Sequence, residues 1–201
     1  MASFTELLRD VRACRVCEQD LPEGPRPVLQ CSPQSRILIA GQAPGSKVHQ
    51  SGIPFDDASG KRLRDWLGID SEVFYDADKI AILPMGFCYP GTSASGDLPP
   101  RPECAANWRQ LLLEKLENIE LTLVLGQYAQ QFHLGKTSKG KNGQTLTELV
   151  KDWPKFWPHL IPLPHPSPRN NRWLKLNPWF ELELLPEVKI LVQKILQAGT
   201  S

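Results

Sequence analysis

Two groups of residues in this chain of 201 residues have types and spacings that could do chemistry. The first is the run HPSPRNNRW, residues 165–173, which surrounds one histidine with prolines, arginines and asparagines. A histidine can donate or accept a hydrogen bond and titrates near neutral pH, and prolines fix the backbone that carries it. The second group is four cysteines, whose thiolates could bind a soft metal. The first group suits a substrate and the second suits a metal centre.

Four short apolar runs predict the strands that position the histidine. They are nearly continuous, as strands buried on both faces require, and cover residues 36–41, 80–87, 121–126 and 159–166. Helical patterns alternate with them at residues 59–68, 102–117, 127–135 and 145–153, and again in a long final helix over 179–197. This alternation predicts an α/β fold, a three-layer α/β/α sandwich with a central four-stranded parallel sheet. We expect residues 1–201 to form a single domain.

In sheets of this kind, ligands bind outside the carboxyl ends of the strands. The first predicted strand is followed there by GQAPGSKVHQSGIPFDDASG, residues 41–60, and the last by the histidine run. The glycines and prolines of either loop could serve a tight turn alone. The presence of both loops predicts that they converge on one site.

The composition limits the classes of protein to consider. The hydrophobic content of 41% and charged content of 22% are ordinary for a soluble globular protein, and no apolar run approaches the length of a membrane span. The first 14 residues read as an amphipathic helix without the apolar core of a signal peptide, so we expect a cytoplasmic protein. The net charge of +1 does not exclude nucleic acid, because a basic groove can lie on a neutral protein.

The cysteines allow three interpretations. Cys14 and Cys17 form a CxxC pair before the first strand, whereas a thioredoxin-type motif would follow that strand. With Cys88 and Cys104 they supply four sulfur donors, which suit zinc or an iron–sulfur cluster, and the thiols could also be unligated. Cys31 lies outside the pattern, and we expect a small buried residue there.

The two loops, in this order, resemble the motifs of the uracil-DNA glycosylase superfamily, which are G-x-x-P-G after the first strand and H-P-S after the last. HPSPRN is similar to the second motif of the single-strand-selective monofunctional glycosylases, and GQAPG with GIPFDDASG resembles the iron–sulfur families of thermophiles. The resemblance covers residues 10–190. It implies a monomeric DNA glycosylase of base excision repair that flips a deaminated base and hydrolyses its N-glycosidic bond. The expected base is uracil, with hypoxanthine and xanthine as further candidates.

The resemblance also implies roles for individual residues. His165 matches the histidine that donates a hydrogen bond to the departing base, and Phe55 matches the ring on which that base stacks. The cysteine spacing resembles the ligands of a [4Fe–4S] cluster, here Cys14, Cys17, Cys88 and Cys104. The other expected contacts are with the base, from Gly41, Ala43 and Gly86, and with the DNA backbone, from Ser167, Arg169, Asn170 and Arg172.

The group that activates water is less directly matched. Superfamily members carry an acid at a position that corresponds here to Gln42 or Ala43. Gln42 can position a water molecule but cannot take its proton. The segment DDASG resembles a downstream acidic motif of one iron–sulfur family and makes Asp57 the catalytic candidate, with Asp56 as the alternative. Asp57 could instead cap the helix that follows it.

One departure from the family pattern affects base choice. Many members read uracil with an asparagine where this chain has Pro84, so recognition would depend on backbone groups of residues 83–91 or would be broad. A catalytically weak or inactive iron–sulfur DNA-binding protein of the same fold is therefore the alternative. A zinc hydrolase acting on small substrates is a second rival. No lysine is placed by a motif for a lyase step.

Some charged and aromatic residues lie outside the motifs. Arg62 and Arg64, with Lys136, Lys139 and Lys141, could approach DNA or could simply be solvated. We expect NPWFE, residues 177–181, to dock and cap the final helix rather than to act in catalysis.

Overall fold

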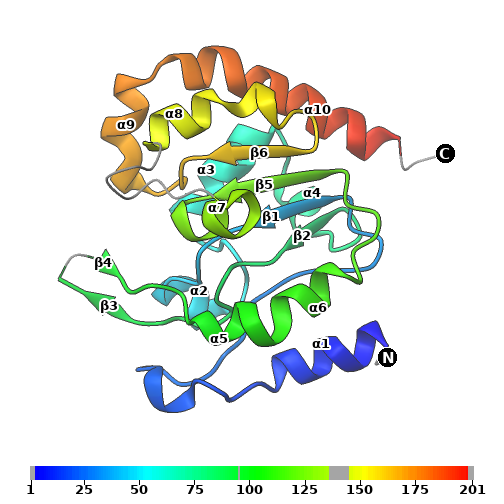
Figure 1. Cartoon of the computed structure of the whole chain (residues 1–201), viewed down its shortest axis with the longest axis vertical. Helices are drawn as coiled ribbons and strands as arrows, with labels where there is room; N and C mark the ends of the chain where they lie inside the picture. The colour runs from blue at the N-terminus through cyan, green and yellow to red at the C-terminus, as the bar shows by residue number, and fades with distance from the viewer. Residues whose placement is uncertain (1–2, 95, 136–144, 199–201) are drawn as a thin grey trace.

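The structure, a computed structural model, describes residues 3–94, 96–135 and 145–198. Its centre is a parallel sheet of four strands in the order β2–β1–β5–β6 (Figure 1). Ile37 of β1 lies opposite Ile80 of β2 and Leu121 of β5. The predicted α/β/α sandwich is therefore confirmed. The strands are β1 (Ile37–Ala40), β2 (Ile80–Ile82), β5 (Leu121–Leu125) and β6 (Leu160–Leu163).

Each strand sends alternate side chains to the two faces of the sheet, as the pleat requires. Ile37 and Ile39 enter one apolar cluster, and Leu38 between them enters another. Both faces are thus covered, which explains the continuous apolar runs. The first cluster includes residues of α3 (Ala58–Leu67), α4 (Ser71–Tyr75), α8 (Leu146–Lys151) and α10 (Leu185–Gln197). The opposite face is covered by α1 (Phe4–Arg12), α6 (Gln110–Leu113) and α7 (Gln127–Leu134).

The helix ends follow from local sequence. The Ser3 hydroxyl and the Glu6 carboxylate form a capping box at the start of α1. Asp57 caps α3, which ends at Gly68 with a φ of +67°. A left-handed residue at this position favours glycine, because a Cβ would be strained there.

Two helices predicted as continuous contain wider, π-helical turns. Residues 102–113 divide into α5 (Pro102–Cys104), η2 (Ala105–Arg109) and α6. The final helix begins with η5 (Phe180–Leu184), because Pro186 has no N–H to donate to the preceding turn.

The η2 turn ends at Arg109, which is fully buried. One guanidinium nitrogen of Arg109 donates to the Leu83 carbonyl at 3.2 Å and lies 3.0 Å from His133 Nε2. Burial lowers the pKa of Arg109 to about 10. Because Leu83 precedes Pro84, this buried cation supports the chain where β2 ends.

Several short elements were not predicted. The sequence predicts a loop over residues 165–173, but these residues include a 3-10 turn and the start of α9. The 3-10 turn and α9 are too short to show the apolar periodicity by which a helix is recognised in a sequence, and they lie within a polar run. The unpredicted elements are η1 (Glu18–Asp20), α2 (Ser46–Ser51), α4, the antiparallel strands β3 (Thr92–Ser93) and β4 (Gly96–Asp97), η3 (Trp153–Lys155), η4 (Pro168–Asn170) and α9 (Asn171–Leu176).

Three remaining predictions concern single segments. Cys31 is buried, as expected, and packs with α1 and α6. Asn177 joins α9 to the final helix, since its side chain donates to Trp173 O at 2.8 Å and accepts from Trp179 Nε1 at 3.1 Å. Lys136, Lys139 and Lys141 lie outside the described residues. Within the described parts of the chain, every helix is too short or too polar to span a bilayer.

Candidate active site

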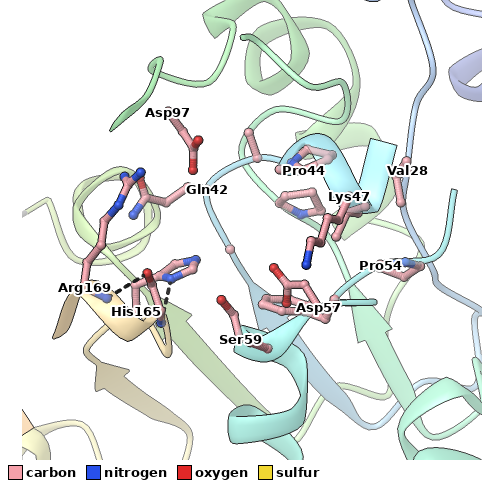
Figure 2. Close-up of a pocket in the computed structure, with 18 of the residues that line it drawn as sticks. Val28, Gln42, Pro44, Lys47, Pro54, Asp57, Ser59, Asp97, His165 and Arg169 are labelled. Atoms are coloured by element: carbon pink, nitrogen blue, oxygen red, sulfur yellow. Dashed lines mark hydrogen bonds between the residues drawn. The ribbon is translucent and has the colours of Figure 1, made fainter. Parts of the chain in front are cut away.

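A pocket of about 490 Å³ opens at the carboxyl ends of the strands (Figure 2). The loop after β1 and the loop after β6 both line it, so the two motif loops lie at one site. Gly86, Arg172 and Asp56 are not among its lining residues. The predicted site residues that do line it are Gly41, Gln42, Ala43, Phe55, Asp57, His165, Ser167, Arg169 and Asn170.

The imidazole of His165 is held in a defined orientation. The Ser167 backbone N–H donates to His165 Nδ1 at 3.3 Å. Because Nδ1 accepts this bond, the proton of the neutral ring belongs on Nε2. Burial lowers the pKa of His165, while the negative charges of Asp57 and Asp97 oppose that shift. The ring therefore stays neutral at physiological pH and has one N–H to offer a ligand.

The backbone around His165 is braced from two sides. Asn170 Nδ2 donates to the His165 carbonyl at 2.7 Å. Arg62 of α3 donates to the carbonyls of Pro166 and Ser167 at 3.3 and 3.2 Å. Arg62 thus positions the histidine loop, which neither of its predicted roles anticipated. Arg64 is also engaged within the protein, where it donates to the Tyr75 hydroxyl at 3.3 Å.

Phe55 has a fixed ring and an unusual backbone. Its φ is +56°, a left-handed value that is uncommon outside glycine. The ring packs edge-on against Phe74, with centroids 6.2 Å apart, and a Cβ on Gly41 would lie 3.5 Å from Phe55 Cζ. Gly60 has no room for a side chain, because a Cβ there would clash with the Phe55 carbonyl. The sequence GIPFDDASG therefore builds one rigid turn beside Gly41.

Asp57 both caps α3 and lines the pocket. Its Oδ1 accepts from the Gly60 N–H at 2.9 Å, so the capping role considered from the sequence is present. Its carboxylate also faces the cavity (Figure 2). The neighbouring Asp56 is exposed and does not line the pocket, which disfavours it as the group that activates water.

Gln42 and Arg169 are each seated against a glycine. A Cβ on Gly126, whose φ is +81°, would clash with the Gln42 carboxamide. A Cβ on Gly96, whose φ is +121°, would clash with the Arg169 guanidinium. Gly126 directly follows β5 and Gly96 begins β4. These contacts bring Gln42 to the β5 side of the pocket and hold the β3–β4 pair beside the histidine loop.

The pocket has two chemically different walls. Four apolar residues, Val28, Ile82, Pro84 and Pro90, form what we name the β2-side wall, with Lys47 near Val28 in Figure 2. Across the cavity lie Gln42, Asp97, His165 and Arg169, a polar group that we name the β6-side wall because His165 and Arg169 follow β6. Figure 2 shows Val28 across the cavity from the labelled side chains of the β6-side wall.

Three polar lining residues were missed from the sequence. Lys47 and Ser59 lie within the first loop, but neither matched a motif. Asp97 lies on the two-residue strand β4, which is too short to leave a periodic signal. Pro84 lines the pocket where the family asparagine was expected, and among the described residues the β2-side wall has no side-chain amide in its place.

The four motif cysteines lie in one neighbourhood. Burial raises the pKa of Cys88 to about 12, and the charges of Cys104, Cys14 and Cys17 add to that rise. Trp108 Nε1 donates to Cys14 Sγ at 3.2 Å, and the Phe87 N–H donates to Cys104 Sγ at 3.5 Å. Across the described residues, however, no three His, Cys, Asp or Glu side chains form a group that could hold a metal ion.

Comparisons with known proteins place these motifs in a family context. The family model described as "Uracil DNA glycosylase superfamily" matches residues 29–189. A Type-4 uracil-DNA glycosylase of Archaeoglobus fulgidus is 25% identical over 134 residues, which are 66% of this chain and 64% of that relative. The match thus spans less than two thirds of the relative's length. Cys14 and Cys17 precede the region that the family model matches.

Proposed function

Because the chain belongs to the uracil-DNA glycosylase superfamily, we propose that it is a monofunctional DNA glycosylase of base excision repair. In this proposal one domain, residues 1–201, flips a deaminated base out of DNA and hydrolyses its N-glycosidic bond. The observation that carries the proposal is the pocket in which His165, with Nδ1 occupied by the Ser167 N–H, meets the loop after β1. A purely structural histidine would not need a free N–H at a cavity.

The leaving base acquires negative charge as the bond breaks. The Nε2–H of His165 donates to the base oxygen where that charge collects. A neutral imidazole suffices for this hydrogen bond, in agreement with the lowered pKa of His165. Phe55 offers the flipped base a flat apolar face, because its ring is fixed between Gly41 and Phe74.

The sugar acquires positive charge in the same step, and a carboxylate stabilises it. Asp57 is the candidate for this role, since its second oxygen is not needed for the helix cap. Gln42 holds the water, and its carboxamide makes no hydrogen bond with another described residue. Removal of the base then ends with an abasic sugar, and no lyase step is included.

The base range follows from the walls of the pocket. Gly41 and Ala43 let the base approach the backbone closely, and both line the cavity. Gly86 acts on the pocket indirectly, because its backbone N–H donates to the backbone carbonyl of Gln42 at 2.9 Å and so supports the chain at Gln42. Without an amide on the β2-side wall, strict selection of uracil is absent, and hypoxanthine and xanthine are also accepted.

The proposed DNA contacts surround the histidine loop. Ser167, Arg169 and Asn170 line the mouth of the pocket, and the exposed Arg172 follows on α9. Their side chains are suited to phosphate oxygens, which dominate affinity for DNA.

We also propose that Cys14, Cys17, Cys88 and Cys104 hold a [4Fe–4S] cluster. The donor chemistry fits, because four free thiols come from three places in the chain and two of the sulfurs accept N–H hydrogen bonds. When bound, the cluster supplies a structural tie between the N-terminal segment and the chain after β2. The side chains must converge from the positions described, since they do not form a metal-holding group there.

A metal assay tests the cluster. Anaerobically purified protein is expected to contain iron and acid-labile sulfide in equal amounts and to absorb broadly near ~400 nm. Cys88→Ser should lose this absorption, whereas Cys31→Ser, which changes a cysteine outside the proposed set, should keep it. Protein with zinc, or with no metal after iron–sulfur reconstitution, would contradict the proposal.

An oligonucleotide assay tests the activity. Metal-replete protein is incubated with single- and double-stranded DNA that carries uracil, hypoxanthine or xanthine, and abasic sites are cleaved with alkali. Release of at least one base is expected. If none is released while the protein still binds the oligonucleotides, the chain is instead an inactive DNA-binding protein of this fold.

A further inference from the structure

We propose that Asp97 is a second catalytic carboxylate of this pocket and that it takes the proton of the attacking water, which Gln42 holds in place. The inference rests on the proposed glycosylase function. It assigns the general base that Gln42 and Ala43 do not supply, because an amide and a methyl group cannot accept that proton.

The position of Asp97 is the first support. It lines the pocket from β4, and its carboxylate points toward Gln42 in Figure 2. The Asp97 side chain makes no hydrogen bond or ion pair with another described residue. A carboxylate that is needed for neither a cap nor an ion pair keeps both oxygens for a ligand.

Gln42 provides the second support. Its carboxamide rests against Gly126 and likewise has no hydrogen-bonding partner among the described residues. Gln42 and Asp97 line the same pocket, and an amide and a carboxylate can bind one water between them, with the amide as donor and the carboxylate as acceptor. Gln42 thus positions the water molecule, and Asp97 accepts its proton.

Asp57 stands in contrast. One of its oxygens is held by the Gly60 N–H at 2.9 Å, and it enters the pocket from the start of α3, apart from Gln42. His165 lies within the field of both carboxylates. Asp57 is thus suited to stabilise the positive sugar, while Asp97 faces the water.

The β3–β4 pair that carries Asp97 is anchored to the histidine loop. Thr92 pairs with Asp97 across the two strands, and Arg169 packs against Gly96. Arg169 lies just after His165 in the chain, and Gly96 lies just before Asp97. The contact between Arg169 and Gly96 therefore fixes the positions of His165 and Asp97 relative to each other.

The reaction balances without a further reagent. The water oxygen bonds to C1′ of the sugar as the C1′–N bond breaks, and the electron pair of that bond leaves with the base. One water proton passes to Asp97 and then to solvent. The base anion, hydrogen-bonded to His165, takes a proton from solvent.

Single-turnover base release from the best oligonucleotide substrate tests the inference. Asp97→Asn is nearly isosteric and is expected to slow release by about 100-fold or more, the usual contribution of a general base. Asp97→Glu, which restores a carboxylate, should recover part of the rate. Asp10→Asn, which removes the same charge from the exposed face of α1, should match wild type.

A binding measurement separates chemistry from folding. Affinity for DNA that contains an abasic site should change less than threefold in Asp97→Asn. If that variant releases base within threefold of the wild-type rate, the inference is wrong while the glycosylase function stands. If wild type releases no base from any substrate, the proposed function and this inference both fail.

Discussion

The two walls of the pocket differ in the chemical character of their side chains. The β6-side wall is polar and includes His165, Gln42 and Asp97, whereas the β2-side wall is apolar and ends at Pro84. Bond cleavage requires charged and hydrogen-bonding groups, and these are gathered on the first wall. Recognition of one base over another requires polar groups at its edge, and the side chains of Val28, Ile82, Pro84 and Pro90 offer none. The roles proposed for the two walls thus separate catalysis from base selection.

The largest effect is expected from a substitution that removes the hydrogen bond between the polar wall and the base. His165→Ala should slow base release by about 10²–10³-fold, because the charge on the leaving base loses its hydrogen-bond donor. Single-turnover rates measure this effect. His159→Ala, a change at an exposed histidine just before β6, is the control. Equal rates for wild type and His165→Ala would show that the polar wall does not carry the chemistry.

A smaller effect is expected from the apolar wall. Pro84→Asn places an amide where the wall offers no hydrogen bond, so kcat/KM for uracil should rise about tenfold relative to hypoxanthine, equivalent to ~1.4 kcal/mol. Competition between the two substrates in one reaction gives the ratio directly. Pro90→Asn tests whether any amide on that wall suffices. An unchanged ratio in Pro84→Asn would mean that the base edge does not face residue 84.

The last effect concerns the support of the apolar wall and is expected in the pH dependence of stability rather than in the rate of base release. Burial and the charge of Arg109 lower the pKa of His133 from 6.5 to about 4. Between these values the unfolded chain binds a proton that the folded chain does not, so stability falls as the pH falls from 6.5 to 4. Since His133 is partly exposed, we expect a loss of roughly 1–3 kcal/mol.

Urea unfolding at pH 7 and pH 4.5 measures this loss. His133→Gln keeps a hydrogen-bond acceptor for Arg109 but does not titrate, so its stability should depend less on pH than that of wild type. His159→Gln should behave as wild type. If His133→Gln and wild type lose equal stability, protons on other groups account for the acid sensitivity.

The sequence was most informative where one physical requirement decided the outcome. Strands buried on both faces must be apolar throughout, so the four central strands could be found from their composition. Parallel strands end at one edge, so the two loops could be expected to meet there. Asp57 also carried a signal, although its cap and its place in the pocket could not be separated without the structure.

Other features depend on contacts that the sequence does not encode locally. Asp97 joins the pocket because Gly96 packs against Arg169, 73 residues away along the chain. Arg62 had the appearance of a solvated helix residue, yet it binds carbonyls of residues 166 and 167. The π-helical turn before α6 similarly reflects the burial of Arg109, which no local pattern predicts.

Two parts of the pocket, the Asp57 carboxylate and the histidine loop, both depend on helix α3. Its first turn is capped by Asp57, and Arg62, one turn further on, holds the backbone of the histidine loop. Fraying of that turn would release the carboxylate and the loop together, since about 7 Å of helix separates the two anchors. Amide hydrogen exchange in the first turn of α3 should therefore report how often the whole site is assembled, without any substrate present.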